Sequence, residues 1–196
     1  MATTKGDETR RAILADALAE ATTVGLTGLT IGTLAKRTSM SKSGLFAHFA
    51  SKEALQIAVL EEARDRFVTS VVSPALKAPR GEPRVRALID GWLRWTELQP
   101  GGCIFIAAAA ELDDRPGPVR DRLVEIERDW IDTLCTAARI AIEQGHFRAD
   151  LDVEQWAFEL WGTMLAYHWH ARLMGDRAAL ERARASFDGL LARSRA

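Results

Sequence analysis

The stretch Thr30–Leu55 constrains the fold more than any other part of the chain, because it predicts two short helices, a tight turn between them and the start of a third helix. Thr30, Ser41 and Ser51 can each cap one of these helices, since a hydroxyl accepts a hydrogen bond from an unpaired backbone N–H. Two short helices around a tight turn form a helix-turn-helix. The second helix, here residues 42–48, would enter the DNA major groove with its N-terminal residues at base edges.

The run Ser41–Leu55 resembles the recognition-helix motif of the TetR family of one-component repressors, nearly position for position. By motif, the resemblance covers roughly the first third of the chain. With the helical character of the rest, it implies an all-α fold of about nine helices. Residues 1–52 would form a three-helix DNA-binding head, and residues 53–196 a C-terminal helical domain for ligand binding and dimerisation. A helix beginning at residue 51 would link the two.

Two positions depart from the family pattern. Phe46 stands where the family usually has a tyrosine whose hydroxyl meets a phosphate, so that contact is absent here. Ser39 stands where the turn usually has glycine, which predicts slight strain in the turn. These departures support an alternative, a helical small-molecule-binding protein without operator recognition.

The distribution of charge fits a DNA-binding head. Residues 1–52 hold seven lysines and arginines against four acids, a net charge of +3, whereas the whole chain of 196 residues carries −1. A basic N-terminal third on an acidic body is typical of a DNA-reading head, although +3 alone is weak evidence. No apolar stretch reaches the ~18–20 residues of a membrane span. Cys103 and Cys135 lack metal or redox spacing, so we expect two thiols in a cytoplasmic protein.

Apolar residues at helical spacing predict further helices on both sides of the motif. The first ends at Gly25. A long helix from Ser51 is expected to be closed by Pro74. Prolines and glycine in residues 73–84 indicate a linker. The uniformly apolar run 103–110 fits a strand or a buried helix, and its alanines favour the helix. The first helix covers residues 7–23, and the remaining predicted helices cover residues 83–98, 118–144, 153–173 and 177–191.

Eight residues of the head are candidate DNA contacts. Lys42 and Ser43 open the recognition helix and are candidates for base edges. Gly44 would let the helix approach closely, and Phe46 would pack or contact a thymine methyl group. The candidate phosphate contacts are Thr30, Ser41, His48 and Lys52, with Arg10, Arg11 and Lys36 adding charge. The capping residues would keep that role with or without DNA.

The C-terminal domain contains a set of mostly aromatic residues that could line a ligand pocket. Aromatic residues at helical spacing are more often core than pocket, so only some of the set would meet a ligand. Glu97, Glu111 and His168 are the polar groups that could orient it. The nine candidates are Trp92, Trp95, Cys103, Phe105, Trp130, Trp161, Met164, Tyr167 and His168.

The predicted partners are operator DNA, a small-molecule effector and a second copy of the chain. The helices over residues 153–173 and 177–191 carry more apolar surface than one small domain can cover, which predicts an isologous four-helix dimer interface. No constellation of residues argues for catalysis, a cofactor or a metal. The prediction is a repressor released from a palindromic operator by a small apolar or aromatic ligand, with an activator left open.

Overall fold

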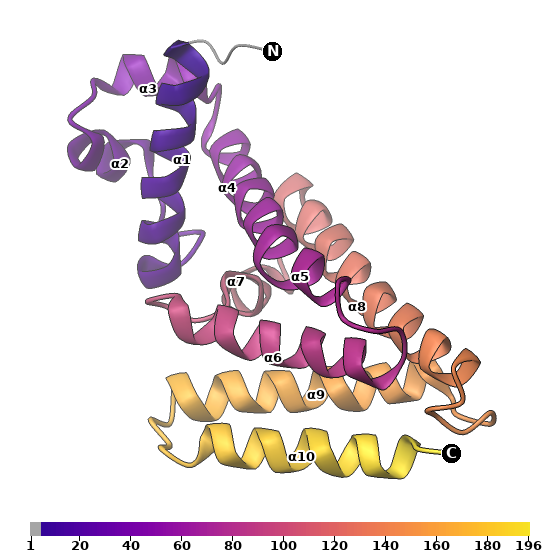
Figure 1. Ribbon diagram of the computed structural model, residues 1–196. Coiled ribbons are helices and arrows are strands. Elements are labelled where there is room, and N and C mark those ends of the chain that lie inside the picture. The colour runs from indigo at the N-terminus through magenta and orange to yellow at the C-terminus, as the bar shows by residue number, and fades with distance from the viewer. Residues whose placement is uncertain (1–4) are drawn as a thin grey trace. The chain divides into compact units, whose positions relative to one another are not determined.

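The computed structural model describes residues 5–196, and within that range the protein is built from helices without a β-strand. The predicted all-α fold is confirmed, with nine helices in this range when α4, the π-helical turn η1 and α5 are counted as the continuous run that they form. The sequence before Asp7 has no helical pattern and predicts a flexible arm over residues 1–5, which lies outside the described residues except for Lys5, where α1 begins. The elements in Figure 1 are α1 (Lys5–Val24), α2 (Ile31–Thr38), α3 (Lys42–His48), α4 (Lys52–Phe67), η1 (Val68–Val72), α5 (Ser73–Ala75), α6 (Glu82–Leu98), α7 (Ile104–Leu112), α8 (Pro118–Glu143), α9 (Val153–Arg172) and α10 (Ala179–Ser194).

The described chain consists of two compact units. The first combines the residues up to Arg66 with Gln99–Ile126, and the second combines Phe67–Leu98 with Glu127–Ala196. Helices α4 and α8 each begin in the first unit and continue into the second. The functional division into residues 1–52 and 53–196 remains a prediction about which residues bind DNA.

Each predicted cap around the helix-turn-helix is present. The Thr30 hydroxyl accepts from the Thr33 backbone N–H at 3.0 Å, and the Thr33 hydroxyl meets the Thr30 N–H in return. The Ser41 hydroxyl accepts from the Gly44 N–H at 3.0 Å, and Ser51 caps α4 in the same way. These bonds satisfy backbone donors that the first turn of a helix leaves unpaired, so they fix where each helix starts.

The long helix after the motif does not end at Pro74, contrary to the prediction. It passes from α4 into the π-helical turn η1 and on to α5, where Pro74 occupies the first turn. The run ends at Ala75, the residue after Pro74, because proline has no N–H with which to extend the ladder of backbone hydrogen bonds. Apolar residues at four-residue steps along this run form a buried stripe, which comprises Leu55, Val59, Ala63, Phe67 and Val71.

The π-helical turn explains how that stripe stays inward. An α-helix has 3.6 residues per turn, so a repeat of four drifts around its axis. A π-helical turn, bonded from residue i to i+5, holds more residues and recovers part of this drift. The predicted linker over residues 73–84 contains α5, a short turn and the start of α6, all within the second unit.

In the second unit, α9 and α10 run side by side and α6 packs on η1 and α5 (Figure 1). The ends of α6 and α10 are tied together by the Arg195 guanidinium, which donates to the Glu82 carboxylate at 2.7 and 2.9 Å. Hydrogen bonds from Arg195 and then Arg86 hold the pKa of Glu82 at about 2, well below its ordinary value. An isolated bridge between Phe147 and Arg195 adds a backbone tie at the same end.

Ser39 makes the turn between α2 and α3 in the left-handed conformation, with φ 54° and ψ 28°. Its backbone N–H donates to the Ala35 carbonyl and closes the end of α2. Ser39 is the one non-glycine residue with positive φ in the described part of the chain. A side chain in this conformation costs roughly 1–2 kcal/mol, which is the slight strain expected from the missing glycine.

We predict that Ser39→Gly raises the free energy of unfolding by roughly 0.5–1 kcal/mol, because relief of this strain exceeds the extra entropy of glycine in the unfolded chain. Chemical denaturation followed by circular dichroism measures the change. Ser39→Ala keeps the β-carbon and is expected to give no such gain. A loss of stability in Ser39→Gly would mean that the serine side chain, rather than the backbone conformation, governs the turn.

Candidate nucleic-acid interface

Helix α3 has a buried side and an outward side. Leu45 and Phe49 are fully buried and anchor it in the core, as the four-residue spacing predicts. Lys42 and Ser43 are exposed, and Phe46 is 51% exposed despite being aromatic. The outward side therefore offers a cation, a hydroxyl and an apolar ring within about two turns.

The candidate phosphate contacts lie around the ends of α2, α3 and α4. Thr30 and Ser41 use their hydroxyl oxygens as caps, and Ser41 also lies 3.0 Å from the hydroxyl of Ser43. His48 is half-buried at the end of α3. The exposed Lys52 donates to the Thr27 carbonyl at 2.6 Å, an intramolecular contact that the sequence does not predict.

Arg10 is held against the core rather than displayed. Its guanidinium lies over the Phe49 ring, 4.6 Å from the centroid, and its Nη1 atom is buried without a hydrogen-bond partner. Arg11 and Lys36 are exposed. Of the three basic residues expected to add phosphate charge, Arg10 is therefore the one whose side chain packs inward.

The loop before the helix-turn-helix is bound by a carboxylate from α7. Glu111 accepts from the backbone N–H groups of Leu26 at 3.0 Å and Thr27 at 2.7 Å, and from the Thr27 hydroxyl at 2.5 Å. Gly25 ends α1 with φ 82°, and a β-carbon there would lie 2.5 Å from a Glu111 carboxylate oxygen. Glu111 is thus bound to this loop, a contact that the sequence does not predict, and its expected role as a ligand-orienting group stays a prediction.

Helix α4 holds the other side of the same loop. The buried Gln56 amide donates to the Leu26 carbonyl at 2.8 Å, alongside the bond from Lys52 to Thr27. Farther along α4, Glu61 accepts two bonds from the guanidinium of Arg122 on α8, at 2.5 and 3.0 Å. The bonds from Arg122 hold the pKa of Glu61 below its ordinary value. The residues of α7 and of early α8 therefore belong to the unit that carries the helix-turn-helix.

The apolar run 103–110 is confirmed as helical, since α7 occupies Ile104–Leu112. Its two ligand-pocket candidates, Cys103 and Phe105, are buried in the first unit. The other seven candidates belong to the second unit, so the nine do not share one unit. Trp92 and Tyr167 pack there edge to face, 5.8 Å between centroids.

The second unit also contains an aromatic cluster around Phe67. The Phe67 ring lies 5.6 Å from the Trp95 ring and 5.0 Å from the Trp130 ring, edge to face in both pairs. One turn before Trp130 on α8, Glu127 has a carboxylate oxygen that is buried without a hydrogen-bond partner. Burial raises the pKa of Glu127 to about 7. Sequence reasoning missed Glu127, because an acid on a long polar helix looks like an ordinary exposed residue.

Comparison with known protein families decides what this arrangement is. The pattern described as "Tetracyclin repressor-like, C-terminal domain" matches residues 81–187, and "Bacterial regulatory proteins, tetR family" matches residues 13–59. The chain belongs to the TetR family. It is a helix-turn-helix transcriptional regulator with a DNA-binding N-terminal domain and a ligand-binding C-terminal domain.

Solved structures of TetR-family regulators are similar over nearly the whole chain. A TetR transcriptional regulator from Chloroflexus aurantiacus J-10-FL is 28% identical, with 96% of this chain and 94% of that chain covered and a TM-score of 0.84. AibR, solved with isovaleryl coenzyme A and operator DNA, is 27% identical over 83% and 85% of the two chains, with a TM-score of 0.67. A TetR-family regulator from Cytophaga hutchinsonii is 23% identical over 100% and 98%, with a TM-score of 0.86. No curated protein sequence matches the chain.

Helix α9 of this TetR-family chain has an outward apolar face as well as a buried one. Phe158 is 73% exposed and Trp169 is 59% exposed, with the exposed Leu165 between them at helical spacing. Trp156, Ala157, Leu160, Met164 and Tyr167 form the buried face. This outward apolar face is left uncovered by the chain's own described residues.

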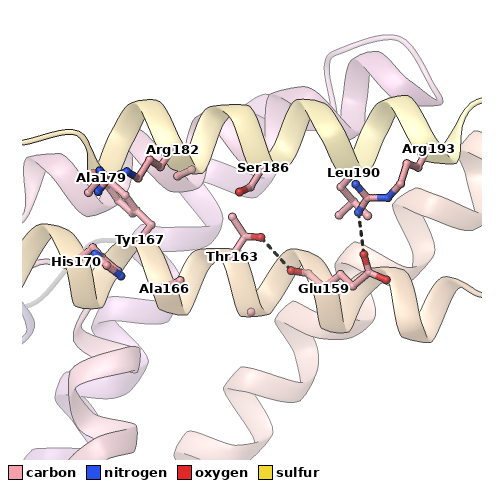
Figure 2. Close-up of a pocket in the computed structure, with 12 residues that line it drawn as sticks. Glu159, Thr163, Ala166, Tyr167, His170, Ala179, Arg182, Ser186, Leu190 and Arg193 are labelled. Atoms are coloured by element: carbon pink, nitrogen blue, oxygen red, sulfur yellow. Dashed lines mark hydrogen bonds and ion pairs between the residues drawn. The ribbon is translucent and has the colours of Figure 1, made fainter. Parts of the chain in front are cut away.

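A groove of about 470 Å³ runs between α9 and α10. Figure 2 shows Thr163 of α9 and Ser186 of α10 within it. Near one end the Arg193 guanidinium donates to the Glu159 carboxylate at 3.1 Å.

Every helix in residues 5–196 is too short or too polar to cross a bilayer. The same residues contain no group of three His, Cys, Asp or Glu side chains placed to hold a metal ion.

We predict that Glu111→Gln exposes the Leu26 and Thr27 amides to hydrogen exchange on the order of 10- to 100-fold faster, because hydrogen bonds to a charged group contribute about 1.5–3 kcal/mol. An amide side chain cannot accept from both N–H groups and the Thr27 hydroxyl as the carboxylate does. Exchange followed by NMR or mass spectrometry measures this. Asp114→Asn removes an exposed charge just after α7 and should leave both amides protected. Unchanged protection in Glu111→Gln would show that α4 alone holds the loop.

Proposed function

We propose that the chain represses transcription as a homodimer on a palindromic operator, and that a small apolar or aromatic ligand bound by the C-terminal domain releases it. The observation that carries this proposal is the outward side of α3, where Lys42, Ser43 and Phe46 are exposed on a helix that Leu45 anchors. A protein that only bound small molecules would not need such a set of side chains on this helix.

The outward side chains match the chemistry of base edges. Lys42 can donate to guanine O6 or N7, and Ser43 can serve either type of base. Phe46 is suited to a thymine methyl group, since it lacks the hydroxyl that would meet a phosphate. Gly44 keeps the helix surface low between them, so that α3 can enter the major groove.

The backbone contacts would come from the ends of the helices. The capping hydroxyls of Thr30 and Ser41 accept from backbone N–H groups, and their own hydrogens can be donated to phosphate. Lys52 uses one of three ammonium hydrogens on Thr27, which leaves two for a phosphate. His48 would add a contact at the end of α3. These groups position the protein, and α3 supplies the sequence preference.

The dimer would form through α9 and α10. Large exposed apolar patches mark interaction sites, and Phe158, Leu165 and Trp169 form a patch on one face of α9. In an isologous pair, the same face of a second copy covers this patch, and four helices meet. The groove between α9 and α10 would accept side chains of the second copy.

Release would follow if the ligand favours a conformation with a different separation of the two heads. Helix α8 links ligand candidates such as Trp130 to the first unit, where Arg122 binds α4. Helix α7 adds Glu111, which binds the loop before α2. AibR was solved with both an acyl coenzyme A and operator DNA, which supports the same two kinds of partner here. We place the protein with its DNA in the cytoplasm, acting by binding rather than catalysis.

We predict that Lys42→Ala weakens binding to the operator by about 10- to 100-fold and relaxes preference at one base pair of each half-site, as expected for a lost base contact of about 1–3 kcal/mol. Fluorescence anisotropy on operator variants at fixed salt measures both effects. Lys77→Ala, in the turn after α5, removes the same charge from an exposed site and should change little. Equal binding of all base variants by wild type and Lys42→Ala would support the small-molecule-binding alternative.

We predict that Trp169→Glu converts the dimer to a monomer at micromolar concentration, because it places a charge in the apolar face that the second copy would bury. Sedimentation velocity or light scattering measures the mass. Gln155→Glu, an exposed position near the start of α9, adds the same charge and should leave the dimer intact. A dimeric Trp169→Glu protein would locate the interface elsewhere.

A further inference from the structure

The aromatic cluster of the second unit contains polar atoms that nothing in the described chain satisfies. The Oε1 atom of Glu127 and the Nε1 atoms of Trp95 and Trp130 are all buried without a hydrogen-bond partner. Glu127 and Trp130 lie three residues apart on α8 and so share a face of that helix. Trp95 joins them through Phe67, whose ring contacts both indoles.

Such a set of unpaired groups is costly to keep. A buried carboxylate without a partner loses its hydration and gains nothing in return. Burial raises the pKa of Glu127 to about 7, and no described residue forms a hydrogen bond with its Oε1 atom. Each indole N–H adds a buried donor without an acceptor. Costs of this kind are typical of sites whose missing partner is a ligand.

The chemistry of the cluster selects the class of that partner. The carboxylate oxygen needs a donor and a positive charge, and the faces of aromatic rings attract cations. The two indole N–H groups need an acceptor such as a hydroxyl or carbonyl oxygen. A neutral apolar molecule would satisfy none of these groups and would leave the carboxylate uncompensated.

We propose that Glu127, Phe67, Trp95 and Trp130 bind the positively charged end of the effector, which is an organic ammonium ion on an apolar or aromatic body. This inference rests on the proposed function only in taking the C-terminal domain as the site of the effector. It narrows the effector from any small apolar molecule to a cationic one. Glu127 supplies the charge and a hydrogen-bond acceptor, and the rings supply the walls.

The proposed preference for a cation can be tested with two probes of similar size. Benzylamine is a cation at about pH 7.5, and benzyl alcohol is neutral. Calorimetry or tryptophan fluorescence measures the affinity of the protein for each. We expect wild-type protein to bind the cation at least about 10-fold more tightly than the alcohol. Glu127→Gln should abolish this preference while leaving the affinity for the alcohol unchanged. Asp129→Asn, an exposed charge on the same helix, should retain it. Equal affinity for the two probes, no binding of the cation at millimolar concentration, or an unaltered preference in Glu127→Gln would overturn the proposal.

Folding of the variant provides a second test. Because the pKa of Glu127 is raised in the folded protein, ionisation destabilises the fold as pH rises from about 4.5 to about 7, and the penalty is complete above that range. Glu127→Gln should therefore raise the melting temperature near pH 8 and leave it unchanged near pH 4. A lower melting temperature near pH 8 would mean that the carboxylate has a stabilising partner, which contradicts the proposal.

Operator binding measured without benzylamine or benzyl alcohol distinguishes a failure of the cation site from a failure of the proposed function. A protein that binds its operator but shows no preference for benzylamine over benzyl alcohol would disprove only the cation site. A protein that shows the Glu127-dependent preference but enriches no DNA sequence would support the cation site and disprove only the regulator.

Discussion

The carboxylate of Glu111 is the contact on which the DNA-binding unit depends most. It holds two backbone N–H groups and a hydroxyl of the loop that leads into α2, while Gln56 and Lys52 hold the carbonyls of the same loop. Gly25 is required beside it, both by its positive φ and by the closeness of the carboxylate. A segment more than eighty residues away in sequence therefore fixes where the helix-turn-helix begins. A signal that moves α7 would reach the DNA-binding helices through this one loop.

The two units differ in how their charged side chains are paired. In the first unit, Glu61 and Arg122 form a matched pair, and the Arg10 guanidinium, whose Nη1 atom lacks a hydrogen-bond partner, lies over the Phe49 ring. In the second unit, Glu127 keeps a buried carboxylate oxygen that no described residue satisfies. Replacing an unpaired buried charge generally stabilises a protein, so its presence is best explained by a ligand that pairs with it. If the proposed cationic effector binds there, it completes the second unit, whereas α3 is anchored by Leu45 and Phe49 of the same chain.

Local signals in the sequence predicted the helix-turn-helix well. The caps at Thr30, Ser41 and Ser51 and the buried pair Leu45 and Phe49 follow from residue type and short spacing alone. The long helix extends one residue beyond Pro74, because the π-helical turn η1 continues into α5. The Glu111 contact and the burial of Glu127 join residues far apart in sequence, and no local pattern encodes such contacts. The division of the nine ligand candidates also depends on such contacts, since Cys103 and Phe105 fold into the first unit and the other seven into the second.

A dimeric repressor makes one geometric demand on DNA, which is that two copies of α3 read the two halves of an inverted repeat. The most direct test is to select fragments of genomic DNA with the purified protein at fixed salt and to sequence those that it retains. The account predicts a palindrome whose half-site centres lie one helical turn apart, 10–10.5 base pairs, or a whole multiple of it. Enrichment of a single unrepeated site would contradict the dimeric arrangement. Absence of any enrichment above sequence-independent binding would contradict the assignment of α3 as a recognition helix.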